Sequence, residues 1–149
     1  MNPHPYLRAY LAGVFVTTLI LPVMLTAFIV IRLVLQLPVP IERGLIFPMA
    51  LVPAGWGIWN MIWLASHERT HFAVGVHGAL FPFVLVPIGT TVARSLGVLS
   101  FGASSATWFN ACSIPYAWLA VGFSCAVAAY YLVWKYIVGF VNSTLGIAS

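Results

Sequence analysis

The stretch YLAGVFVTTLILPVMLTAFIVIRLVL, residues 10–35, decides the class of this protein. It contains a single charged side chain, Arg32. A helix needs about 20 predominantly apolar residues to cross the hydrocarbon core of a bilayer. The stretch therefore predicts a membrane-spanning helix, and Pro22 in its middle predicts a kink in that helix.

The composition of the whole chain extends this conclusion. Of the 149 residues, 62% are hydrophobic and 5% are charged, and the mean hydropathy is +1.05. A soluble domain carries about 25% charged residues, because its surface must be hydrated. The sequence therefore predicts an integral membrane protein.

Three further apolar segments follow the first, at residues 44–65, 72–92 and 114–138. Residues 95–113 are richer in glycine and serine, so we expect an interfacial or re-entrant segment there and not a fifth span. We find no internal repeat and no soluble domain. The predicted fold is all-α: residues 1–149 form a single membrane domain, a bundle of four transmembrane helices with short loops.

The basic residues do not decide the orientation of this bundle. With four spans, both termini and residues 66–71 share one side. The basic residues then divide equally, with Arg8, Arg69 and Lys135 on that side and Arg32, Arg43 and Arg94 on the other. Positive residues normally mark the cytoplasmic side. The early positive charge and the loop histidines favour cytoplasmic termini, in a bacterial inner membrane.

The positions of the basic residues and of the two cysteines argue against a nucleic-acid partner and against a disulfide. The basic residues are scattered singly, whereas a nucleic-acid surface gathers several together, so we expect no nucleic-acid partner. On one helix, Cys112 and Cys125 would lie about 19 Å apart along the axis. That separation excludes a disulfide between them, because the two Cα atoms must come within about 7 Å.

The segment SHERTHFAVGVHG, residues 66–78, contains three of the four histidines. Its HERTH portion resembles the H-E-x-x-H motif of zinc metalloproteases, in which the two histidines bind one zinc ion. His77 stands where the longer metzincin motif has its last histidine, but Val74 replaces the glycine of that family. The resemblance implies a membrane zinc hydrolase with His67, His71 and His77 as metal ligands and Glu68 as the catalytic base.

Three features favour a polar turn at residues 66–71 instead. The only other acidic residue, Glu42, begins the second span while the motif ends it, so it cannot serve as a distal metal ligand. The chain is too short for a substrate-binding lobe. Positive side chains such as Arg69 are also stabilised at a helix C-terminus. We interpret the segment as a wet turn and keep the zinc hydrolase as the alternative.

His77 requires a separate explanation because it lies five or six residues inside the third predicted span. An ionisable side chain at that depth is costly and is a candidate functional residue. The simpler alternative is a neutral histidine that is hydrogen-bonded to a neighbouring helix. A second alternative function is a haem or redox subunit. It requires two histidines facing each other in the membrane, and only His77 is suitably placed.

Three tryptophans share one face of the second span. Trp56, Trp59 and Trp63 follow helical spacing, and Asn60 lies on the same face. This aromatic face either binds a lipid tail, a quinone or a polyisoprenoid, or packs against other helices. The candidate ligand-binding residues are Trp56, Trp59, Asn60, Trp63 and His77.

The sequence contains no evident nucleophile–base pair and no cofactor motif. We therefore predict a small polytopic membrane protein without catalytic machinery and without a cofactor. It would be an accessory subunit or a binder of a lipid-like ligand, in contact with membrane lipids. Small residues in the fourth span, Gly122, Ala126 and Ala129, permit close helix approach and hence a homo-oligomer or a larger membrane complex.

Overall fold

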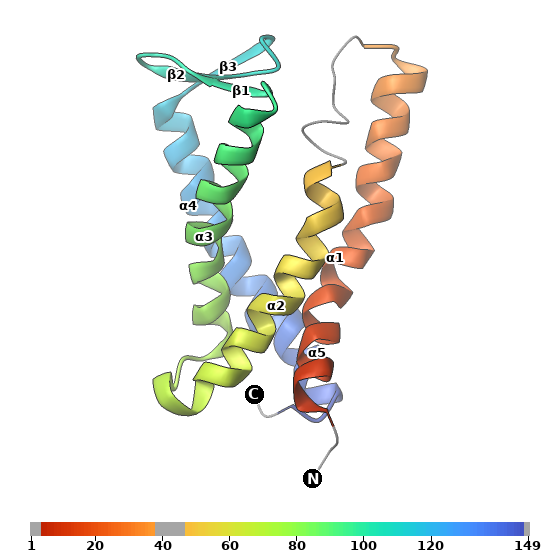
Figure 1. Ribbon diagram of the computed structural model, residues 1–149, viewed down its shortest axis with the longest axis vertical. Coiled ribbons are helices and arrows are strands. Elements are labelled where there is room, and N and C mark those ends of the chain that lie inside the picture. Colours follow the sequence, from red (N-terminus) through yellow and green to blue (C-terminus); the bar gives the residue numbers. More distant parts are fainter. Residues whose placement is uncertain (1–3, 38–46, 148–149) are drawn as a thin grey trace.

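The computed structural model describes residues 4–37 and 47–147, and it is mostly helical (Figure 1). The four long helices are α1 (Pro5–Ile29), α2 (Phe47–Thr70), α3 (Val74–Ser95) and α4 (Tyr116–Val133). A π-helical turn, η1 (Val30–Val34), extends α1. A second π-helical turn, η3 (Trp134–Val138), joins α4 to the short helix α5 (Gly139–Thr144).

Three short strands lie mostly within residues 95–113, the segment that we expected to be interfacial or re-entrant. They are β1 (Leu99–Phe101), β2 (Ser105–Trp108) and β3 (Cys112–Pro115), and they form one antiparallel sheet in the order β1-β2-β3. The all-α expectation is therefore wrong for this part of the chain. In β2, Ala106 is buried, whereas the Thr107 hydroxyl lies on the other face of the sheet and bonds Ser113.

The helices are longer than the sequence predicted. α1 begins at Pro5, and proline is well tolerated at a helix start. The helix that begins as α4 continues through η3 and α5 to Thr144. The expected turn at residues 66–71 is wrong, because α2 runs through Thr70. The loop begins only at His71, whose positive φ of 52° ends the helix. The predicted start of the second span, residues 44–46, lies outside the described residues.

The helices form two pairs, α1 with α2 and α3 with α4 (Figure 1). The loop between α2 and α3 lies at the same end of the molecule as both termini, and the sheet lies at the opposite end. A guanidinium nitrogen of Arg8 donates to the Leu145 carbonyl at 3.1 Å, which joins the two ends of the chain. Toward the sheet, the two pairs diverge.

Glycines allow the helices to approach closely at two crossings. A Cβ at Gly13 would overlap the backbone of Trp56 and Gly57, so α1 and α2 touch backbone to backbone there. A Cβ at Gly78 would overlap the Trp134 side chain, so this indole packs directly on the α3 backbone. Each contact lies within one pair and holds its two helices together.

Within residues 4–37 and 47–147, three helical segments are long and apolar enough to cross a membrane, by length and composition alone. They are Pro5–Val34, Val74–Ser95 and Tyr116–Thr144. α2 is not among them. It lies between α1 and α3 and carries both the buried amide of Asn60 and the polar residues 67–70 of the HERTH segment.

Candidate functional site

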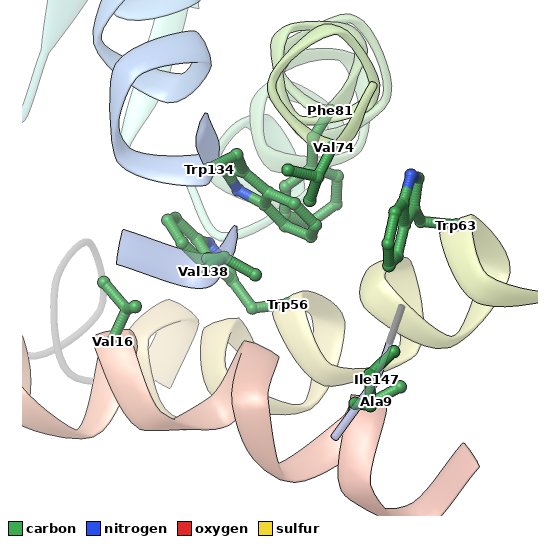
Figure 2. Close-up of a cluster of buried hydrophobic side chains, with 9 residues drawn as sticks. All are labelled: Ala9, Val16, Trp56, Trp63, Val74, Phe81, Trp134, Val138 and Ile147. Atoms are coloured by element: carbon green, nitrogen blue, oxygen red, sulfur yellow. The ribbon is translucent and has the colours of Figure 1, made fainter. Parts of the chain in front are cut away.

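A cluster of aromatic rings from three helices and a π-helical turn lies where the two helix pairs meet (Figure 2). Trp56 of α2 is at its centre and is 5% exposed. The ring centroid of Trp56 lies 6.3 Å from that of Phe81, 5.2 Å from that of Tyr130 and 5.5 Å from that of Trp134. The cluster therefore joins α2 to α3, α4 and η3.

An apolar cleft lies between α2 and α3, in the half of the molecule that carries the sheet. Its volume is about 260 Å³. The residues that line it are Leu51, Val52, Gly55, Phe81, Val84, Leu85, Ile88, Gly89 and Val92. None of these side chains is charged or polar.

A second, smaller cavity of about 110 Å³ lies between α1, α2 and α4. The residues that line it are Thr17, Ile20, Leu21, Val52, Pro53, Trp56 and Tyr130. Val52 lines both spaces, so the cavity and the cleft adjoin each other at this residue. Together they form the cleft–cavity site, with the aromatic cluster at the end nearer the termini.

Trp59 and His77 form a reciprocal contact between α2 and α3. The Trp59 Nε1 donates to the His77 carbonyl at 3.0 Å, and the His77 Nε2 lies 3.1 Å from the Trp59 carbonyl. Because a carbonyl only accepts, the proton of the His77 ring lies on Nε2. The two rings stack with centroids 4.6 Å apart and an interplanar angle of 26°. His77 is thus hydrogen-bonded to a neighbouring helix, as in the simpler of the two interpretations of its sequence position.

Asn60 and Trp63 also bond to neighbouring segments. The Asn60 Nδ2 donates to the Ala9 carbonyl at 2.7 Å and to the Asn142 Oδ1 at 2.8 Å. The Trp63 Nε1 donates to the Phe72 carbonyl at 3.1 Å. Of the five predicted ligand residues, Trp56 lines the site, while the polar groups of the other four already have partners within the protein.

Asn142 is a buried polar residue that sequence reasoning missed. It is fully buried in α5 and donates back to the Asn60 Oδ1 at 3.2 Å. The sequence did contain a signal for it, because the Asn142 amide stands within the apolar C-terminal run. An amide in such a run needs a partner when it is buried.

The three histidines of the zinc motif are not brought together. The His67 Nδ1 lies 3.2 Å from the Phe72 carbonyl, His71 is exposed, and His77 is engaged with Trp59. Over residues 4–37 and 47–147, no group of three or more histidine, cysteine or acidic side chains is placed to hold a metal. Glu68 is exposed, and Glu42 lies outside the described residues. The residues do not fit the zinc site that the motif implies.

The haem alternative requires a second buried histidine facing His77. Of the four histidines, His77 is 6% exposed, His4 and His71 are exposed, and His67 is half-buried at the end of α2. His67 and His77 lie on either side of the turn that joins α2 to α3, and each is hydrogen-bonded to a backbone carbonyl. They do not form a facing pair across a cavity.

No family model matches the sequence, and no match was found among curated proteins or among solved structures.

Proposed function

We propose that this chain is an integral membrane protein that binds a lipid-like apolar molecule in the cleft–cavity site and serves as an accessory subunit without chemistry of its own. The exposure of its helices supports membrane insertion. Leu19, Val23 and Leu33 of the first helical segment are 60%, 66% and 65% exposed. A soluble protein rarely presents large contiguous apolar surfaces to water, whereas lipid tails solvate them well.

The observation that carries the ligand proposal is the cleft between α2 and α3. Its 260 Å³ are slightly below the volume of pockets for drug-sized molecules, which begin at about 300 Å³. A helix is about 10 Å in diameter, so a partner helix would not fit without separating α2 from α3. A flexible hydrocarbon chain is narrower and matches the apolar lining.

The chemistry of the lining supports binding instead of catalysis. The side chains of the cleft are aliphatic or aromatic, and two of its positions are glycine. General acid–base or nucleophilic catalysis needs a titratable group within hydrogen-bond reach of the reacting atoms. The lining of the cleft supplies affinity for a chain and no such group.

Localisation forms part of the same proposal. Both termini lie at one end of the molecule (Figure 1), together with Arg8 and the Arg69 region. We propose that this end faces the cytoplasm of a bacterial inner membrane, because it carries the early positive charge and the loop histidines; the basic residues as a whole divide equally between the two sides. A reporter that is active only in the cytoplasm, fused to the C-terminus, tests the orientation. An inactive fusion, together with activity of a second C-terminal reporter that works only outside the cytoplasm, would contradict it.

Two glycines provide a matched test of the ligand proposal. Gly89 lines the cleft, and Gly122 lies on α4 away from its lining. For both, a Cβ would meet no described atom within 4 Å, so a larger side chain should fit. Gly89→Leu would fill the cleft, whereas Gly122→Leu would add the same bulk elsewhere.

Native mass spectrometry of detergent-purified protein measures the result. The wild type and Gly122→Leu should retain a lipid-like adduct, and Gly89→Leu should lose most of it. Equal retention by all three proteins would contradict binding in the cleft. The absence of an adduct from the wild type, combined with no saturable binding of added lipids, would contradict ligand binding altogether.

A further inference from the structure

Lys135 is the single charged residue of the apolar segment Tyr116–Thr144, and it lies in the π-helical turn η3. In this turn the N–H of Gly139 bonds to the Trp134 carbonyl five residues earlier. Trp134 is fully buried, whereas its neighbour Lys135 is exposed. Single π-helical turns are rare and frequently occur at functional sites. A cation within a membrane-spanning segment likewise points to a functional role.

The depth of Lys135 in the membrane follows from its contact with α3. A Cβ at Gly75, the second residue of α3, would lie 2.9 Å from the Lys135 Cβ. The 22 residues of α3 extend for about 33 Å, which matches a hydrocarbon core of about 30 Å. The first turn of α3, and Lys135 beside it, therefore lie near the boundary between hydrocarbon and headgroups, at the end of the molecule that carries both termini.

Two tyrosines flank the ammonium group of Lys135. Its Nζ lies 5.6 Å from the ring centroid of Tyr131 and 5.1 Å from that of Tyr136, within the range of a cation–π contact. Both hydroxyls lie close to the ammonium, and each can accept one N–H and still donate its own O–H. The acidic side chain that residues 4–37 and 47–147 contain, Glu68, makes no ion pair with Lys135. The group thus presents an ammonium and two hydroxyl donors at the level of the headgroups.

We propose that Lys135, Tyr131 and Tyr136 bind the phosphate group of an anionic membrane lipid. A phosphate carries the complementary charge, and its oxygens accept hydrogen bonds from ammonium and hydroxyl groups. The surroundings favour a lipid over a free phosphate ion as the source of this group. Leu132 and Phe140 of the same helical segment are 51% and 69% exposed, and they offer apolar surface to the acyl chains.

This phosphate site is separate from the cleft–cavity site and goes beyond the proposed function. The cleft lies in the half of the molecule that carries the sheet, whereas Lys135 lies beside the opposite end of α3. Neither Lys135 nor the two tyrosines line the cleft or the cavity. A lipid at this exposed site exchanges with detergent, so its binding is measured with added lipid and not by copurification.

The test measures the preference of the purified protein for phosphatidylglycerol over phosphatidylcholine. The two lipids are added in equal amounts to the micelles and have identical acyl chains, but only phosphatidylglycerol is a net anion. Native mass spectrometry gives the ratio of the two singly bound adducts, and binding through the chains alone does not alter this ratio. Lys135→Met removes the charge and keeps an unbranched stem against Gly75, whereas Lys135→Arg keeps the charge.

Arg94 provides the matched control for this lysine. It is an exposed cation at the other end of α3, and its guanidinium lies 6.0 Å from the centroid of a single ring, that of Phe101. Arg94→Met therefore removes the same charge without affecting the paired tyrosines. Tyr136→Phe removes one hydroxyl and keeps its ring. Gly89→Leu, which fills the cleft, separates this site from the cleft ligand.

The wild type should prefer phosphatidylglycerol, and Lys135→Met should lower this preference roughly fivefold, the effect of one basic residue at an anionic membrane surface. Tyr136→Phe should lower it about threefold, the effect of one neutral hydrogen bond. Lys135→Arg, Arg94→Met and Gly89→Leu should retain most of the preference.

Three results would overturn the phosphate site. They are no preference in the wild type, an equal loss in Arg94→Met and Lys135→Met, and a loss in Gly89→Leu. Inorganic phosphate, added at the concentration of the lipids, should leave the preference unchanged. Displacement of phosphatidylglycerol by this ion would assign the site to a soluble anion and would overturn the lipid as its ligand.

Discussion

Asn60 of α2 and Asn142 of α5 donate hydrogen bonds to each other's side-chain oxygens, at 2.8 and 3.2 Å. Both residues are fully buried, and Asn60 also donates to the Ala9 carbonyl of α1 at 2.7 Å. One amide pair thus connects the second helix to both ends of the chain. In an apolar environment, such bonds supply specificity that hydrophobic contact between helices does not.

Replacing one member of this pair should destabilise the protein. In Asn60→Leu, the Asn142 amide stays buried without its partner, and the Ala9 carbonyl loses a donor. We expect a loss of about 1–2 kcal/mol in the free energy of unfolding, the scale measured for polar contacts in membranes and for orphaned amides. Unfolding by a denaturing detergent in mixed micelles measures this change.

A double-mutant cycle isolates the pair from the effects of the single changes. Asn60→Leu combined with Asn142→Leu should be less destabilised than the sum of the two single variants, because neither amide is then orphaned. Strict additivity of the three measurements would contradict a direct contact between the two amides.

The close approach of α1 and α2 predicts sensitivity at Gly13. A methyl group there overlaps the backbone of Trp56, which cannot rotate away, so Gly13→Ala should separate the two helices. We expect a loss of about 1–3 kcal/mol, typical of an overpacked contact. Gly122→Ala, which meets no described atom within 4 Å, is the matched control and should be neutral or slightly stabilising. Equal thermal stability of the two variants would rule out this helix crossing.

The reciprocal contact of Trp59 and His77 predicts a graded response. His77→Phe keeps a ring to stack on Trp59 and loses only the Nε2 donor, so it should cost about 1 kcal/mol. His77→Ala loses the stacking as well and should cost about 2–4 kcal/mol, the range for removing a large buried side chain. His71→Ala, at an exposed position, should have little effect on the melting temperature. An effect of His71→Ala as large as that of His77→Ala would contradict this assignment.

Metal removal tests the separation of the three histidines. Because His67, His71 and His77 do not converge, a strong chelator should leave the melting temperature unchanged. Zinc in the purified protein should stay below about a tenth of an equivalent, since a structural metal would contribute folding energy outright. Stoichiometric zinc together with a chelator-induced drop in melting temperature would restore the hydrolase alternative.

The long helices were predictable because their signal is local. Residues 10–35 form an apolar run, and its length alone implies a spanning helix. The small sheet was not predictable in this way. Its strands are three or four residues long, and the turn between β2 and β3 depends on the left-handed conformations of Phe109 and Asn110. Strands this short carry too little alternation to distinguish them from a glycine- and serine-rich loop.

The candidate site was predictable only in part. Helical spacing predicts that Trp56, Trp59 and Trp63 share one face of α2, but it could not show which of them borders a cavity. That outcome depends on partners distant in sequence: Trp59 meets His77 on α3, while Asn60 meets Asn142 on α5. The end of α2 was placed too early because the polar HERTH segment was read as a turn, although it lacks the glycine or proline that stops a helix.

Photo-crosslinking with a diazirine-bearing fatty acid ester in native membranes tests the central claim most directly. Peptide mapping by mass spectrometry locates the crosslinks. Binding in the cleft predicts labels on residues 51–55 of α2 and 81–92 of α3, which an excess of unlabelled ester abolishes and Gly89→Leu prevents. Labels confined to the outward positions, such as Leu19 of α1 and Trp118 of α4, and insensitive to competitor, would contradict a ligand site between the helix pairs.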